Sequence, residues 1–375
     1  MNIYFDNAAT TKLDEEVIKV MQETMQNNFG NPSSTHTYGR KAKNTLENCR
    51  RDIARHFGAL PSEIIFTSGG SEADNMAIKC AIFDLEVTRI ITSEIEHKAV
   101  LSTALKMAKL TNVKVEFVNV NHFGDVDLKH LEELLSSSDE KTLVTLMHAN
   151  NEIGTLLPIK KVGDLCKNYK ALFHSDTVQT VGHYNLNFEE LGIDFGTCSA
   201  HKIHGPKGSG FIYINKKLSV SSMLIGGGQE RGLRAGTENL IGITGLHKAL
   251  ELCYTNLEKD QDYILELKNY MKKGLEKAFG NKIKFNGNQK KSLYTVLSVS
   301  FENDLTNSML LFKLDIKGIA VSGGSACNSG ANQGSHVISK ITDENIIPIR
   351  FSFSKFNTKE EVDYCLMELV KIIDV

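Results

Sequence analysis

Short apolar runs and longer amphipathic stretches take turns along the first two thirds of the sequence. The runs EIIFTS, RIITS, KVEFVNV and ALFHSD have the length of buried strands, whereas SEADNMAIKCAIF and EHKAVLSTALKMAKL have the spacing of helices. Strands and helices that alternate in this way build a mostly parallel sheet with helices on both faces. The pattern predicts a large α/β domain over residues 13–260.

The rest of the chain has a different order of elements. A charge-rich helical stretch, NLEKDQDYILELKNYMKKGLEKAF, precedes the apolar runs KIKFNG, TVLSVSFE and IRFSFSK, and KEEVDYCLMELVKII reads as a final helix. We therefore predict a smaller α+β domain that consists of residues 261–375 together with residues 1–12.

Charge and cysteine content exclude several classes of protein. Lys and Arg total 43 against 45 Asp and Glu, and no basic tract is present, so nucleic acid is not an expected partner. No apolar run approaches the roughly 20 residues that cross a bilayer, so we expect a cytoplasmic protein without a membrane span. The seven scattered cysteines include no Cys-x-x-Cys pair, which predicts reduced thiols and no metal site.

Polar residues follow several predicted strands, at the edge of the sheet where α/β proteins bind ligands. Gly70 and Ser71 stand between a strand and a helix, an arrangement that suits a phosphate and is also typical of a simple turn. Asp176 ends one strand, as a catalytic carboxylate or a helix cap, and Lys202 follows the next. A carboxylate for a pyridinium nitrogen, a lysine for a Schiff base and a phosphate cradle together describe a pyridoxal phosphate site.

Nine motifs, in order along nearly the whole chain, carry a more specific resemblance. They are FDNAATT, GNPSSTH, SGGSEADN, EHKAV, NNEIG, SAHKIHGPKGSG, GGGQERGLRAGT, SGGSAC and IRFSFSKF. The sequence resembles the NifS/IscS-type cysteine desulfurases, class V aminotransferases with the aspartate aminotransferase fold, which is pyridoxal phosphate fold type I. The resemblance implies a sulfurtransferase that converts L-cysteine to L-alanine and holds the sulfur as an enzyme persulfide for iron–sulfur cluster assembly or other thiolation.

The resemblance also implies a role for each residue that matches a family motif. Lys202 matches the Schiff-base lysine, His97 the imidazole on the cofactor ring that shuttles a thiol proton, and Asp176 the partner of the pyridine nitrogen. The remaining cofactor contacts are expected from Gln179 at the ring oxygen, from Gly70, Ser71, Ser199 and His201 at the phosphate, and from Asn151.

Two further implications concern the substrate and the assembly. Asn151 and Arg350 match the groups that hold the substrate carboxylate. Thr237 matches the residue that reaches the phosphate from the other subunit of a homodimer. Sulfur-accepting proteins such as an iron–sulfur scaffold are the expected partners, although the chain ends at DYCLMELVKIIDV without the tail that IscS-type members use to dock a scaffold.

Cys327 is the predicted sulfur carrier. Six of the seven cysteines lie in apolar or amphipathic runs, where a thiol behaves as a small hydrophobe, whereas Cys327 stands in the Gly/Ser/Asn-rich stretch SGGSACNSGANQGS. A stretch of this composition predicts an exposed loop that could visit the substrate and carry sulfur away. The alternative is a selenocysteine lyase or another pyridoxal phosphate-dependent lyase or aminotransferase of the same fold, which would not need Cys327.

Overall fold

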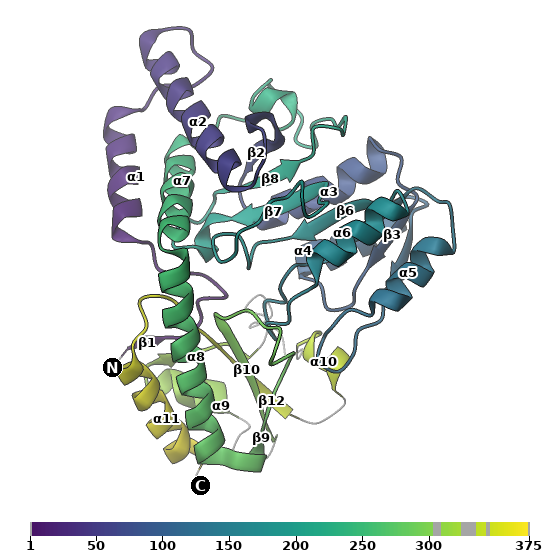
Figure 1. Ribbon diagram of the computed structural model, residues 1–375. Helices are drawn as coiled ribbons and strands as arrows, with labels where there is room; N and C mark the ends of the chain where they lie inside the picture. The colour runs from purple at the N-terminus through teal and green to yellow at the C-terminus, as the bar shows by residue number, and fades with distance from the viewer. Residues whose placement is uncertain (1, 303–308, 324–334, 343–345, 374–375) are drawn as a thin grey trace.

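A seven-stranded sheet is the largest element of the computed structural model, which describes residues 2–302, 309–323, 335–342 and 346–373 (Figure 1). The strand order is β2-β8-β7-β6-β5-β3-β4, in which β8 is antiparallel to both of its neighbours and the other pairs are parallel. The strands are β2 (Ile64–Thr67), β3 (Arg89–Thr92), β4 (Lys114–Phe117), β5 (Thr142–Thr145), β6 (Leu172–Asp176), β7 (Phe195–Ser199) and β8 (Gly210–Ile214).

Both faces of the sheet are buried over its central strands, where successive residues belong to different hydrophobic clusters. Ile64 and Ile65 belong to opposite clusters, and so do Leu143 and Val144, as the alternation of side chains along a strand requires. Helices α3 (Gly70–Phe83) and α4 (Lys98–Leu110) cover one face. The other is covered by α2 (Thr37–His56), α5 (Leu128–Ser136), α6 (Ile159–Asn168) and α7 (Leu240–Thr255), with α1 (Glu15–Asn27) against α7. The predicted helix-covered α/β architecture is confirmed.

A second sheet lies below the first in Figure 1 and has a hydrophobic cluster of its own. Its order is β12-β10-β9, with antiparallel pairs, and β1 pairs in parallel with β11 beside it. The elements are β1 (Ile3–Tyr4), α8 (Leu257–Phe279), β9 (Ile283–Phe285), β10 (Val296–Glu302), α9 (Leu310–Ile316), β11 (Ile319–Ala320), α10 (Ile338–Ile341), β12 (Ile346–Ser352) and α11 (Lys359–Ile373). The domain division stays a prediction; its boundary falls in the first turn of α8.

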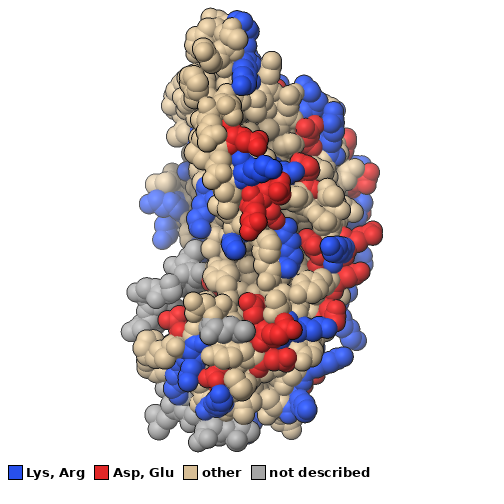
Figure 2. Space-filling model, turned by 90° about the vertical axis from the view of Figure 1, so that its left-hand side faces the viewer, with Lys and Arg blue, Asp and Glu red and all other residues tan. Residues whose placement is uncertain are grey.

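Acidic and basic side chains are interspersed over the face of the molecule drawn in Figure 2. This mixture matches the near balance of charges in the sequence. Within the described part of the chain, no helix combines the length and the apolar character that a bilayer crossing requires.

Candidate active site

The carboxyl ends of the central strands open into a cavity of about 190 Å³. Side chains after β3, β6 and β7 meet there with the start of α3, the N-terminal segment and β12. Ten predicted site residues line it, namely Gly70, Ser71, His97, Asn151, Asp176, Gln179, Ser199, His201, Lys202 and Arg350. Thr237 is exposed and does not line this cavity, and Cys327 lies outside the described residues.

Lys202 lies at the end of a short 3-10 turn that directly follows β7. Its Nζ donates hydrogen bonds to the carbonyl oxygens of Ala8 at 2.6 Å and Ala9 at 2.8 Å. Two backbone acceptors fix the amine at one place in the cavity, although neither was predicted from the sequence.

Residues 6–11, which we call the N-terminal strap, make most of the long-range bonds around this lysine. Thr10 Oγ1 lies 3.2 Å from His201 Nδ1, and Thr11 Oγ1 accepts from the backbone N–H of His204 at 2.7 Å. The strap therefore holds the segment that carries Lys202 on both sides of the lysine.

Asp176 and His97 occupy one wall of the cavity. Asp176 is the last residue of β6, and its Oδ1 accepts from the backbone N–H of Val178 at 2.9 Å. Burial, and then the neighbouring charge of Asp74, raise the pKa of Asp176. His97 caps α4, because its Nδ1 accepts from the backbone N–H of Ala99 at 3.2 Å. Burial lowers the pKa of His97, so the neutral ring carries its proton on Nε2.

Asp74 is a site residue that sequence reasoning missed. It lies on α3 four residues after Gly70, which is one helical turn, and it lines the same cavity. A carboxylate oxygen of Asp74, a carboxylate oxygen of Asp176 and a ring nitrogen of His97 all lie within 4.8 Å of one another. The signal in the sequence was this one-turn spacing from Gly70, which places Asp74 on the cavity side of the helix.

The start of α3 provides a place for an anion. Gly69 precedes the helix and makes no side-chain cap, so the first N–H groups are left for another acceptor. A Cβ on Gly70 would lie 2.9 Å from Val178 Cγ2, which explains the glycine there. Burial first, then the charges of Lys202 and Lys207, lower the pKa of His201 to about 4, so this ring is neutral at pH 7.

Arg350 belongs to β12, and its side chain lines the cavity from that strand. Its Nη1 donates to the backbone oxygen of Asn151 at 2.8 Å, and its Nη2 pairs with Asp6 Oδ1 at 2.7 Å. The guanidinium is thus fixed by the strap on one side and by the loop after β5 on the other. The structure brings Asn151 and Arg350 together through the main chain of Asn151.

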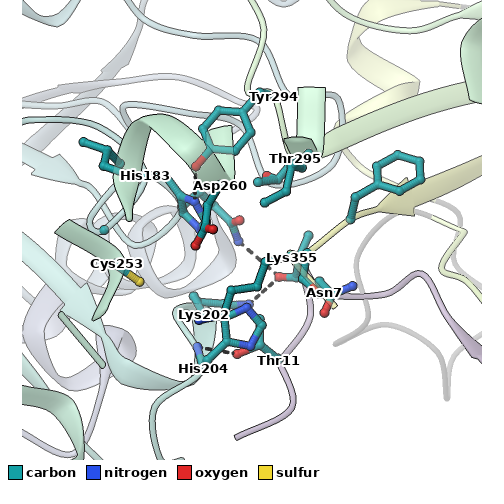
Figure 3. A pocket seen from close by; sticks show the side chains of 17 residues that line it. Asn7, Thr11, His183, Lys202, His204, Cys253, Asp260, Tyr294, Thr295 and Lys355 are labelled. Atoms are coloured by element: carbon teal, nitrogen blue, oxygen red, sulfur yellow. Dashed lines mark hydrogen bonds between the residues drawn. The ribbon is translucent and has the colours of Figure 1, made fainter. Parts of the chain in front are cut away.

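A second cavity, of only about 30 Å³, lies beside Lys202 (Figure 3). It is lined by His183, Cys253, Tyr294 and Lys355, and Tyr294 Oη lies 2.7 Å from His183 Nδ1. A space of this size holds a few water molecules at most. Of these two cavities around Lys202, only the one of about 190 Å³ has room for a cofactor and a substrate.

Comparisons with known proteins agree with this geometry. A family profile described as Aminotransferase class-V matches residues 3–365. The chain is 41% identical to "Cysteine desulfurase IscS" of Dictyoglomus turgidum, over 99% of this chain and 94% of that protein. Among solved structures, a NifS-like protein has a TM-score of 0.92 at 38% identity over all of both chains. The structure of SspA in complex with cysteine has a TM-score of 0.79 at 31% identity, over 95% of this chain and all of that one.

Proposed function

The chain belongs to the aminotransferase class-V family and is a pyridoxal phosphate-dependent cysteine desulfurase, and we propose that it carries the sulfur of L-cysteine as a persulfide on Cys327. L-cysteine is the substrate and L-alanine the second product. Such a persulfide would supply sulfur for iron–sulfur cluster assembly or for other thiolation reactions.

The residues of the large cavity fit pyridoxal phosphate. The uncapped start of α3 suits its phosphate, the Lys202 amine suits its aldehyde, and the buried carboxylate of Asp176 suits its ring nitrogen. When bound, this cofactor withdraws electrons from the bonds around the substrate Cα.

The protein groups have complementary roles in this proposal. Lys202, oriented by the two strap carbonyls, carries the proton that leaves the substrate Cα. Arg350, with Asn151 beside it, holds the substrate carboxylate at the far side of the cavity. The neutral ring of His97 carries its proton on Nε2, and its Nδ1 accepts a hydrogen bond from Ala99. The ring must therefore release Ala99 before it can accept a proton from the Cys327 thiol.

The burial of the described cysteines is the observation that supports Cys327 as sulfur carrier: five of the six are buried and Cys253 is half-buried. Burial raises the pKa of Cys253, which lies beside Lys202, to about 12. Burial is also the main cause that raises the pKa of Cys49, Cys80, Cys166, Cys198 and Cys365. The thiolate is the nucleophile in sulfur transfer, so these six thiols are poor candidates at pH 7.

The test is a Cys327→Ala variant compared with a Cys253→Ala variant. We expect Cys327→Ala to bind the cofactor and L-cysteine and to lose persulfide, sulfide and catalytic alanine formation. Cys253→Ala, which removes the thiol beside Lys202, should retain all three. Persulfide mapping by mass spectrometry after incubation with L-cysteine is the measurement.

Two results would contradict this assignment. Sulfur found first on a thiol other than Cys327, with normal turnover by Cys327→Ala, would place the carrier elsewhere. Selenium release from selenocysteine by Cys327→Ala, combined with negligible use of L-cysteine by the wild type, would favour the selenocysteine lyase alternative.

We also propose a cytoplasmic homodimer with two equivalent sites. Thr237 is exposed and lies outside the cavity of its own chain, which suits a residue that contacts the phosphate of the partner's site. The proposed recipients of the sulfur are acceptor proteins such as an iron–sulfur cluster scaffold.

A further inference from the structure

Two buried carboxylates lie side by side in the wall of the cofactor cavity. The side chains of Asp74 and Asp176 belong to residues that are only 1% and 6% exposed. Oxygen atoms of the two groups lie within 4.8 Å of each other, and Asp74 Oδ1 has no hydrogen-bond partner among the described residues. This oxygen is shielded from solvent, and a carboxylate charge in such a position is costly.

The groups around this carboxylate pair supply little positive charge. His174 on β6 lies 3.4 Å from Asp74 Oδ1, but burial lowers its pKa to about 4, so it is neutral at pH 7. His97 is neutral for the same reason. Glu96, in the loop between β3 and α4, is a third buried acid, and burial raises its pKa to about 8. Lys202 lines the same cavity, with its amine on the strap carbonyls.

Two buried carboxylates within 4.8 Å of each other disfavour each other's ionisation, and a cation beside them offsets that cost. Burial raises the pKa of Asp74 to about 7, which is in line with a pair that keeps one proton near neutral pH. A protonated pyridine ring is such a cation. Its N–H can donate a hydrogen bond to Asp176, and its positive charge also offsets the negative charge of Asp74.

We propose that Asp74 is a positioning residue at the site for the cofactor's protonated ring nitrogen, where its carboxylate beside Asp176 raises the preference of the protein for a basic ring. This inference rests on the proposed function only in that pyridoxal phosphate occupies the cavity. Asp176 contacts the ring nitrogen, and Asp74 acts through Asp176.

If Asp74 has this role, the affinity of the protein for its cofactor should depend on the nitrogen atom of the cofactor ring. An analogue of pyridoxal phosphate with carbon in place of the ring nitrogen cannot supply the cation. The wild type should therefore prefer pyridoxal phosphate over this analogue at pH 8, and Asp74→Asn should reduce the affinity ratio by about tenfold or more. Equilibrium dialysis of the cofactor-free protein against each compound gives the two dissociation constants without any turnover.

The dependence of this ratio on pH has a definite sign. As the pH falls and the carboxylate pair takes up protons, the need for a cation disappears and the ratio should decline. Burial is the main cause that raises the pKa of Asp176, and the charge of Asp74 raises it further; Asp74→Asn removes only this second cause, so the midpoint of the decline should move to lower pH.

Asp194→Asn is the matched control, because Asp194 is another largely buried carboxyl whose pKa is raised by burial, and it does not line this cavity. It should leave the ratio unchanged. Asp74→Ser is the second variant, in case the amide disturbs folding, and circular dichroism checks both. A ratio in folded Asp74→Asn or Asp74→Ser equal to that of the wild type would overturn the proposal.

A different cation would also overturn it. Stoichiometric Zn²⁺ binding by cofactor-free wild type, lost in Asp74→Asn and competitive with pyridoxal phosphate, would assign the carboxylate pair to a metal instead. L-Cysteine turnover is assayed separately: its absence, with the expected change in the ratio, would refute the proposed function and leave this inference standing.

Discussion

Arg350 makes two of its hydrogen bonds to the protein itself before any substrate binds. Asp6 and the backbone of Asn151 take Nη2 and Nη1, so the guanidinium is held rigidly at the cavity wall. A lysine has one nitrogen and cannot reproduce this fork. Arg350→Lys should therefore raise the KM for L-cysteine by about tenfold or more, while cofactor binding stays close to that of the wild type.

Steady-state kinetics and cofactor titration of Arg350→Lys measure these two effects. Arg51→Lys, at an exposed position of α2, is the control and should change neither quantity. An unchanged KM in Arg350→Lys would show that the substrate carboxylate is held elsewhere.

Single residues could be predicted from the sequence where a polar side chain follows an apolar strand or belongs to a recognisable motif. Lys202, Asp176 and the glycine pair are such cases, and the structure places them around one cavity. The contributions of Ala8 and Ala9 could not be predicted, because a carbonyl oxygen has no signature in side-chain chemistry. Asp74 was missed because it lies within a helix rather than directly after a strand, and only its one-turn spacing from Gly70 points to the cavity.

At the scale of elements, α6 shows how a close contact determines which residue type a position can hold. Gly163 lies in the middle of this helix, where glycine is normally unfavourable. A Cβ on Gly163 would lie 1.9 Å from the backbone oxygen of Leu191. Gly163→Ala should therefore lower the free energy of unfolding by about 1–3 kcal/mol, in spite of the better helix propensity of alanine.

Chemical denaturation of Gly163→Ala measures this loss. Lys167→Ala, on an exposed position of the same helix, is the control and should stay within about 0.5 kcal/mol of the wild type. A higher free energy of unfolding in Gly163→Ala would contradict this prediction, because α6 and the backbone of Leu191 would then move apart without loss of stability.

The alternation of apolar and amphipathic segments predicted the strands and helices of the large sheet well, because buried strands and amphipathic helices leave distinct periods in the sequence. The order of the strands could not be predicted in this way. β8 lies between β2 and β7, so the first and last strands of the sheet in the sequence become neighbours. That pairing depends on how the layers pack and leaves no local signal.

At the scale of the whole molecule, an exposed apolar segment precedes Thr237. Ile225 is 92% exposed and Leu224 is 50% exposed, so these two adjacent apolar side chains are available to contact another surface. We expect Ile225→Asp to weaken the proposed homodimer, because a charge would be buried at the interface, and to lower cofactor occupancy, because Thr237 would no longer reach the partner's site.

Sedimentation velocity at several protein concentrations measures the change in Ile225→Asp. Ile316→Asp is the control, since Ile316 is also largely exposed but lies on α9, in another part of the fold. A wild type that sediments as a fully loaded monomer, or an Ile225→Asp variant with an unchanged dimer, would contradict the proposed assembly.

The N-terminal strap has a consequence for how the protein is made. Residues 6–11 are among the first to leave the ribosome, yet their partners His201, Lys202 and Arg350 follow much later in the chain. At typical rates of synthesis, the strap waits roughly half a minute for Arg350. A nascent chain therefore acquires Lys202, the proposed cofactor lysine, well before Arg350, the proposed substrate arginine. Under this proposal, chains released before residue 350 would keep only Asn151 to hold the carboxylate of cysteine, so incomplete products would liberate little sulfur in the cell.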